Sequence, residues 1–175
     1  VSLIHIGPVA EGATNAAIML VGEQPGDEED LRGRPFVGPA GRVLDEALRN
    51  AGLARDQLYI TNAVKHFKWQ PRGKRRLHKR PDAAEVAACN HWLDAEVAQV
   101  KPRIIVALGA SALRAVAGLT DSIESARELR IPHVSGAQIV CTYHPAAILR
   151  AEPTAADVLR QHLVGDLRRA RELVA

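Results

Sequence analysis

The 175-residue sequence is poor in cysteine and has no long apolar run. Its two cysteines, Cys89 and Cys141, cannot build a disulfide framework, so a reducing, cytoplasmic setting is expected. No apolar run approaches the roughly 20 residues that a membrane-spanning helix needs, so no membrane partner is expected. The first 25 residues also lack the basic start and apolar block of a signal peptide.

Motifs that mark several enzyme classes are missing as well. The stretch 22–41, GEQPGDEEDLRGRPFVGPAG, is rich in glycine and proline but matches neither GxxxxGK[ST] nor GxGxxG. This argues against a P-loop nucleotide site and against a dinucleotide-dependent oxidoreductase. The chain has no HExxH motif and no clustered His/Asp ligand spacing, which disfavours a metallohydrolase.

With 47% hydrophobic and 25% charged residues, residues 1–175 are expected to form one domain, acting as a monomer. Four apolar runs are continuous rather than alternating, as in parallel strands that are covered on both faces. These runs are 16–22, 57–64, 103–109 and 137–144.

Helical patterns separate the four runs. They cover 41–52, which ends at Gly52, 82–100 with one apolar stripe, and 110–118. A last helix is expected to begin with Thr154 as its N-cap. Its expected buried positions are Leu159, Leu163, Leu167 and Ala170. The alternation predicts a three-layer α/β/α sandwich around a central four-stranded parallel sheet.

Polar residues stand where these predicted strands end. Glu23 and Gln24 follow the first run, Asn62 ends the second and His144 ends the fourth. Because ligands of open parallel sheets bind beyond the carboxyl ends of the strands, the four residues are expected to meet at one rim. Each alone has a plainer explanation: Asn62 as the cap of a turn, His144 as part of a bend before Pro145. Together they offer groups that match the hydrogen-bonding edge of a pyrimidine.

One basic segment stands out from an otherwise acidic chain. Residues 65–80, KHFKWQPRGKRRLHKR, contain eight Lys/Arg and no Asp/Glu, which leaves 15 basic against 20 acidic residues elsewhere. The segment predicts a localised site for phosphates, although a solvated targeting or anchoring run has the same composition. Phe67 and Trp69 favour nucleic acid, since aromatic rings among cations stack on bases. A single histidine, His78, lies within the run.

The chain resembles the uracil-DNA glycosylase superfamily over nearly its whole length, and family 4 in particular. GEQPGDEEDLRGRPFVGPAGRVLD is similar to the first family motif, with Gln24 where family 4 tends to have Ala. YITNAVKHFK resembles the segment that carries the pyrimidine-binding asparagine, and HPAAILR resembles the second motif, usually HPS. GKRRLH resembles the KRRIH insertion of the UdgX-type branch, whose members form a covalent adduct with DNA.

The resemblance implies a role for each matching residue. Catalysis is assigned to His78, which attacks C1′ of the sugar, to Glu23, which organises the site, and to His144, which stabilises the departing base. The uracil-binding set is Gln24, Pro25, Gly26, Asp27, Phe36 and Asn62. For Phe36 a plain core role is the alternative. The DNA-binding set is Lys74, Arg75 and Arg76 of the basic segment together with Pro145, Ala146, Ile148, Leu149 and Arg150. Within this set, Ile148 and Leu149 are expected to form a tip that inserts into DNA.

The chemistry suits these residue types. The bond to uracil breaks with positive charge on the sugar and negative charge on the base, so a donor at O2 strengthens as the charge develops. A neutral imidazole can take the place of water as nucleophile. The six cations around His78 are expected to keep its ring neutral. Two alternatives stay open: a turnover glycosylase that uses water, and a binding module that does no chemistry. Partners are then uracil-containing DNA, single-stranded by preference, and free uracil as product.

Two departures from the family pattern bear on the site. Ala146 replaces the usual Ser of the second motif and removes a hydroxyl. Relatives carry an iron–sulfur cluster held by an N-terminal CxxC pair and two later ligands, whose places here are taken by His66 and Cys89. This sequence has no CxxC, so a [4Fe-4S] cluster is expected only if an upstream segment supplies cysteines, and Cys89 is equally explained as a buried helix residue.

Overall fold

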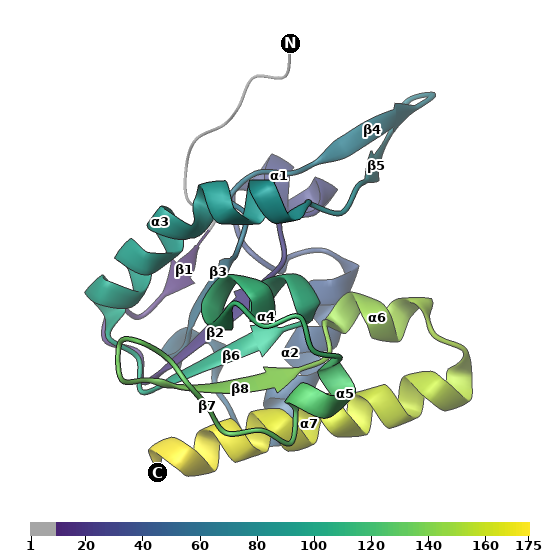
Figure 1. The fold of residues 1–175 in the computed structure, drawn as a ribbon. Helices are drawn as coiled ribbons and strands as arrows, with labels where there is room; N and C mark the ends of the chain where they lie inside the picture. Colours follow the sequence, from purple (N-terminus) through teal and green to yellow (C-terminus); the bar gives the residue numbers. More distant parts are fainter. Residues whose placement is uncertain (1–9) are drawn as a thin grey trace.

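The computed structural model describes residues 10–175 (Figure 1). Its core is a six-stranded sheet with the order β1-β3-β2-β6-β8-β7. The strands are β1 (Glu11–Gly12), β2 (Ile18–Gly22), β3 (Tyr59–Asn62), β6 (Ile104–Leu108), β7 (Ile131–Pro132) and β8 (Gln138–Thr142). The four long strands pair in parallel, as predicted. The antiparallel edges β1 and β7 were not predicted, because two residues are too few to show a periodic pattern.

Helices cover both faces of the sheet and complete the predicted three-layer sandwich (Figure 1). They are α1 (Asp27–Arg32), α2 (Pro39–Ala51), the 3-10 helix η1 (Arg55–Gln57), α3 (Ala83–Val100), α4 (Ala110–Ala117), α5 (Ile123–Ala126), α6 (Pro145–Arg150) and α7 (Pro153–Val174). None of the helices within residues 10–175 has the length and apolarity to cross a bilayer.

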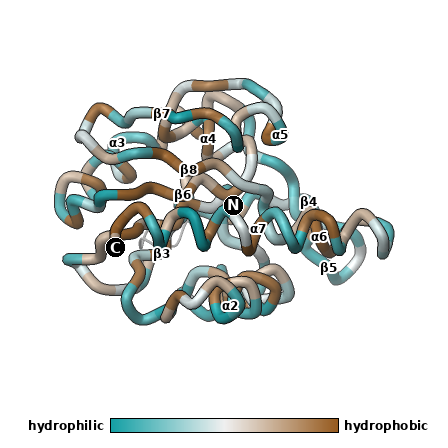
Figure 2. The backbone as a smooth tube through the Cα atoms, turned by 90° about the horizontal axis from the view of Figure 1, so that it is seen from below, coloured by the Kyte–Doolittle hydropathy of each residue, from teal (hydrophilic) through white to brown (hydrophobic). Residues whose placement is uncertain are grey.

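Alternate side chains of each central strand belong to two separate hydrophobic cores, one on each face of the sheet. Leu20 and Val106 pack with residues of α2, α6 and α7, whereas Met19 and Ile105 pack with residues of α3 and α4. In Figure 2 the apolar colour follows β6 and β8 through the middle, while α2 and α7 alternate between apolar and polar. This two-sided burial explains why the strands are continuous apolar runs in the sequence.

The helix ends follow the sequence signals with one exception. Gly52 ends α2 in the left-handed conformation at φ 74°, and Asp82 caps α3 through a hydrogen bond from Glu85 N–H. The expectation that Thr154 caps the last helix is wrong. Helix α7 begins at Pro153 with Glu152 as its N-cap, because proline suits the first helical position, where no N–H is needed. Leu163, Leu167 and Ala170 are buried there, while Leu159 is half-buried.

The basic segment, for which the sequence shows no strand pattern, contains a two-stranded hairpin that projects from the body (Figure 1). Strand β4 (Trp69–Arg72) pairs antiparallel with β5 (Arg75–His78), so that Trp69 lies opposite His78. The two-residue turn places Gly73 at φ 60°, which glycine adopts without strain. His78 therefore lies at the base of the hairpin, next to the body.

Two helical glycines differ in their surroundings and give a stability prediction. A methyl group on Gly165 in α7 meets nothing within 4 Å, whereas one on Gly41 in α2 lies 1.9 Å from the Phe36 carbonyl oxygen. Gly165→Ala is expected to raise the free energy of unfolding by about 1 kcal/mol, because alanine is the better helix former. Gly41→Ala is expected to lower it despite the same gain in propensity. Urea denaturation measures both; equal stabilisation would contradict the close approach at Gly41.

Candidate active site

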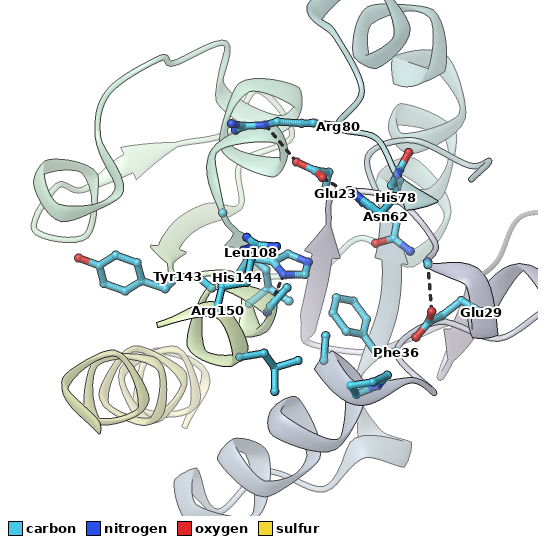
Figure 3. A pocket seen from close by; sticks show the side chains of 18 of the residues that line it. Glu23, Glu29, Phe36, Asn62, His78, Arg80, Leu108, Tyr143, His144 and Arg150 are labelled. Atoms are coloured by element: carbon cyan, nitrogen blue, oxygen red, sulfur yellow. Dashed lines mark hydrogen bonds and ion pairs between the residues drawn. The ribbon is translucent and has the colours of Figure 1, made fainter. Parts of the chain in front are cut away.

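A pocket of about 880 Å³ opens where the parallel strands end. The four residues that stand at the predicted strand ends, Glu23, Gln24, Asn62 and His144, all line it. Figure 3 shows Glu23, Asn62 and His78 along one side of the pocket, with His144 across from them and Phe36 nearby. His78, Arg80 and Arg150 line it as well. Segments far apart in the sequence thus meet at one cavity.

The pocket presents an aromatic ring beside an amide. Phe36 is 6% exposed and packs in the core, yet its ring also lines the pocket, so the core and pocket roles coexist. Asn62 is buried, and its Oδ1 has no hydrogen-bond partner within the described residues. Gly22 makes room for both: a Cβ there would lie 2.4 Å from Asn62 Oδ1 and 2.6 Å from Phe36 Cζ. A buried amide without a partner, next to a ring, suits a flat polar ligand.

His144 faces the pocket as a neutral hydrogen-bond donor. It is the N-cap of α6, and its Nδ1 accepts a hydrogen bond from the Ala146 N–H at 3.0 Å. Burial, with the charges of Arg150 and His78, lowers the pKa of His144 to about 4. The ring is therefore neutral near pH 7, and its proton resides on Nε2 because Nδ1 is an acceptor. The contact uses a backbone N–H, so Ala146 preserves it without the serine hydroxyl.

Gln24 lines the pocket, but its side-chain amide binds the backbone of the hairpin. Its Nε2 donates to the carbonyls of Lys68 and Lys79, and its Oε1 accepts from the Lys68 N–H. The two backbone segments are also joined directly, Lys79 N–H to Lys68 O at 2.9 Å. With its amide occupied on both sides, Gln24 has little capacity left to bind a base. Gly26 and Asp27 line the pocket, whereas Pro25 is buried and does not.

The hairpin is further fixed by ion pairs that the sequence did not reveal. Arg76 pairs with Asp27 and Asp30 of α1, and Lys68 pairs with Glu85 of α3. Although the segment contains no acid, much of its charge is thus neutralised by the body. Lys74 and Arg75 at the tip stay exposed, whereas the guanidinium of Arg76 is directed at α1.

A cluster of polar groups surrounds the carboxylate of Glu23. Ser111 Oγ donates to Oε2 at 2.6 Å, and Arg80 Nε lies 3.4 Å from the same oxygen. His78 Nε2 lies 3.6 Å from Oε1, too far for a direct hydrogen bond but close enough for charge to act. Glu23 therefore connects the end of β2, the start of α4 and the base of the hairpin.

His78 has a lowered pKa, as expected, but for another reason. Burial is the main cause; the nearby Glu23 carboxylate opposes it and the charge of Arg150 adds to it. The cations of the hairpin are not among these causes, because they point elsewhere or are paired with acids. The expectation that six neighbouring cations keep the ring neutral is corrected in this respect.

Three hydrophobic side chains take other positions than expected. Phe67 is buried next to His78, with ring centroids 6.1 Å apart, and the Arg76 guanidinium lies over its ring, so the ring is not open to a base. Trp69 is half-buried and also carries Arg76 over its ring. Residues 145–150 form helix α6, whose Ile148 is 2% exposed and belongs to the core; Leu149 is 51% exposed. Of the two residues of the expected tip, only Leu149 is exposed.

The described residues do not provide a site for an iron–sulfur cluster. Cys89 is buried with Val64 and Val86, and His66 is exposed. Within residues 10–175 no group of three or more His, Cys, Asp or Glu side chains is placed to hold a metal ion. Since a cluster needs four ligands, these residues alone do not fit one.

Sequence reasoning missed several residues that build the site. Ser111 orients Glu23, and Arg80 reaches the same carboxylate. Glu29 is buried and accepts hydrogen bonds from the N–H groups of Gly26, Val37 and Gly38. Ser111 follows directly on a predicted strand end, which is the one signal that was available for it. Glu29 sits among four acids that look alike in the sequence.

The fold and pocket define a doubly wound α/β protein whose pocket lies at the strand ends. A family model of the uracil DNA glycosylase superfamily matches residues 9–168. The chain is 40% identical over 167 residues to the type-4 uracil-DNA glycosylase of Thermotoga maritima, covering 95% of this chain and 82% of that protein. The type-4 enzyme of Pyrobaculum aerophilum is 41% identical over 148 residues (80% and 71%), and that of Sulfurisphaera tokodaii 37% over 171 residues (93% and 72%). The chain therefore belongs to the uracil DNA glycosylase superfamily.

The low pKa of His144 predicts how stability depends on pH. The pKa of His144 in the folded protein, about 4, lies below the ordinary value of 6.5. Between these two pH values the imidazole is therefore protonated in the unfolded chain but not in the folded protein. Stability conferred by the neutral ring is therefore lost as the pH falls from about 6.5 to about 4. In His144→Asn the new side chain can still cap α6. Urea unfolding from pH 7 to 4.5 should show a flatter pH dependence for this variant; identical slopes would contradict the assignment.

Proposed function

We propose that this protein is a uracil-DNA glycosylase of the UdgX type, which releases uracil and then becomes attached to the sugar through His78. The observation that carries the proposal is the shared pocket, which Asn62, Phe36, His144 and His78 line together. The type-4 names of the relatives support base release, and the GKRRLH segment supports the UdgX branch.

Uracil is bound by its ring face and by its edge. Phe36 stacks on the pyrimidine, and Asn62 forms hydrogen bonds with the edge through its unpartnered amide. The target base must leave the base stack to reach this buried pair, at a cost of a few kcal/mol that is smaller in a single strand. We therefore expect single-stranded DNA to be the better substrate.

Bond cleavage is assisted on the side of the base. As the C1′–N1 bond breaks, its electron pair stays with uracil, and the negative charge spreads to O2. The neutral His144 ring donates its Nε2–H to that oxygen, and the hydrogen bond strengthens as the charge grows. Because Nδ1 is tied to the Ala146 N–H, the ring is already oriented before the substrate arrives.

His78 then attacks the sugar. A lone pair of its neutral imidazole forms the new N–C1′ bond with the oxocarbenium carbon that uracil has left, and the ring becomes a cation until it loses its remaining N–H proton to solvent. The Glu23 carboxylate, 3.6 Å away, stabilises that transient charge. If water reaches C1′ first, the same site works as a turnover glycosylase, and His78 only helps to position the strand.

DNA approaches along the lip of the pocket. The exposed Lys74 and Arg75 of the hairpin and Arg150 of α6 hold phosphates on either side. The exposed Leu149 side chain fills the gap that the extruded base leaves in the base stack. Arg76 acts indirectly, because its pairs with Asp27 and Asp30 keep the hairpin against α1.

A denaturing gel with a short single-stranded uracil oligonucleotide tests the proposal. A heat- and detergent-resistant shifted band, absent with a thymine control, is the expected result. Strand breakage after alkali without such a band would instead support the turnover enzyme. Binding that weakens with salt, without base release or adduct, would leave only the nucleic-acid-binding module and overturn the proposal.

Replacement of the nucleophile should separate base release from attachment. His78→Ala is expected to abolish the covalent band while uracil release remains, because Asn62 and His144 are untouched. Gln70→Ala, on the exposed face of the same hairpin, is the matched control and should form adduct normally. Quantitative gels and uracil release are measured in parallel. An adduct formed by His78→Ala would show that another residue is the nucleophile.

Loss of the buried amide should remove base selectivity. Asn62→Ala is expected to lower the preference for uracil over cytosine by about tenfold or more, since a paired set of base-edge hydrogen bonds is worth about 1–3 kcal/mol of discrimination. Asn90, on α3, also has an unpartnered Oδ1 within the described residues but lies outside the pocket, so Asn90→Ala is the control. Release rates from matched oligonucleotides measure the ratio, and unchanged discrimination in Asn62→Ala would refute this role.

A further inference from the structure

The backbone of Phe36 adopts an unfavourable conformation. Its φ of 50° is in the left-handed region, which costs a non-glycine residue free energy unless the surroundings enforce it. Only one other non-glycine residue of the described chain, Lys101, has a positive φ, and it is the C-cap of α3. Phe36, in contrast, lies in a loop whose ring lines the pocket. Something outside the loop must therefore keep it in this conformation.

Arg55 supplies that constraint with its whole guanidinium group. Its NH2 donates to the Pro35 carbonyl at 2.6 Å and its NH1 to the Phe36 carbonyl at 3.2 Å. The other donors bind carboxylates: Nε and NH2 to Glu11 Oε1, and NH1 to Asp45 Oδ1 at 2.7 Å. All five N–H groups are used. The planar fork thus fixes two successive carbonyls of the loop against two acids from other elements.

The same loop is fixed from its other side. The buried Glu29 carboxylate accepts the N–H groups of Val37 and Gly38, the two residues after Phe36. Gly41 leaves space for the Phe36 carbonyl, which a Cβ would approach to 1.9 Å. The ring itself fits over Gly22. Arg55 is the one member of this set that contacts the carbonyls of both Pro35 and Phe36.

We propose that Arg55 is a positioning residue for uracil binding, acting through Phe36. The inference rests on the proposed stacking of uracil on that ring. Without the two carbonyl contacts, Phe36 can relax to a negative φ, and the ring leaves the plane in which it meets the base. The loss is in binding of the extruded base, while the chemistry at His144 and His78 is changed less.

The test compares Arg55→Lys with Arg34→Gln. Lysine keeps the charge but has only a point-like ammonium, which cannot bind two carbonyls and two carboxylates together. Arg34 pairs with the same Glu11 at 2.8 Å but is 63% exposed and makes no contact with Phe36, so its loss removes an ion pair alone. Both variants are checked by thermal unfolding before kinetics.

Single-turnover release from a uracil oligonucleotide, at increasing enzyme concentration, separates binding from chemistry. For Arg55→Lys the half-saturating concentration is expected to rise about tenfold, in the range of one lost base–aromatic stack, with a smaller change in maximal rate. Inhibition by free uracil should weaken in parallel. Arg34→Gln should stay within about twofold of the parent for both, as for an exposed ion pair. Equal effects of the two variants would overturn the inference.

A double-mutant cycle with Phe36→Ala distinguishes this inference from the function on which it rests. If Arg55 acts through the ring, Arg55→Lys has no further effect on half-saturation once Phe36 is alanine. Additive effects would overturn the role of Arg55 while leaving the stacking role intact. A harmless Phe36→Ala would overturn both. Should Arg55→Lys fail to fold, Asp45→Ala removes one acceptor of the guanidinium at a more exposed position and takes its place in the cycle.

Discussion

The parallel pairing of β2 with both β3 and β6 is the constraint on which the site depends. It places Gly22 level with Asn62 and Val21 level with Ala107, so all three strands deliver their next residues to one edge. The buried amide of Asn62 then lies against Gly22, and Glu23 meets Ser111 at the start of α4. A slip of one residue in either pairing would turn alternate side chains to the other core and separate these groups. Packing of the hydrophobic cores on the two faces therefore fixes the strand register, and the register fixes the relative positions of the site residues.

The hairpin is the opposite case, because its own structure is too weak to hold a side chain in place. An isolated two-stranded hairpin is marginally stable in water. Polar contacts to the body substitute for a core: Gln24 binds the backbone of Lys68 and Lys79 where the hairpin begins and ends, and Arg76 pairs with α1. His78 sits beside these contacts, over the buried Phe67. The basic segment thus divides into cations that fix the hairpin and cations at the tip that stay exposed.

The sheet, its two covered faces and the meeting of Glu23, Asn62 and His144 were predictable, because apolar periodicity and strand ends are local signals. The partners of polar side chains were not. Gln24 matched a uracil-binding motif, yet its amide binds the hairpin; Phe67 stood among cations, yet it is buried. Both outcomes depend on contacts between residues more than 40 positions apart or on burial by a hairpin that was not foreseen. Arg55 shows the limit most clearly, since nothing beside it in the sequence indicates that it binds the carbonyls of Pro35 and Phe36.

Two histidines in one pocket have pKa values that are lowered by the same main cause, and they differ in how their rings are held. Burial is the main cause of the lowered pKa of both His144 and His78. His144 is fixed through Nδ1 to the backbone of α6, which leaves a single proton on Nε2 and makes the ring a donor. His78 lies 3.6 Å from the nearest carboxylate, so its ring is oriented by packing and by charge rather than by a short hydrogen bond. A donor must be oriented before charge develops on the base, whereas a nucleophile must be able to move onto C1′ afterwards. The difference in attachment therefore fits the order of the two steps that we propose.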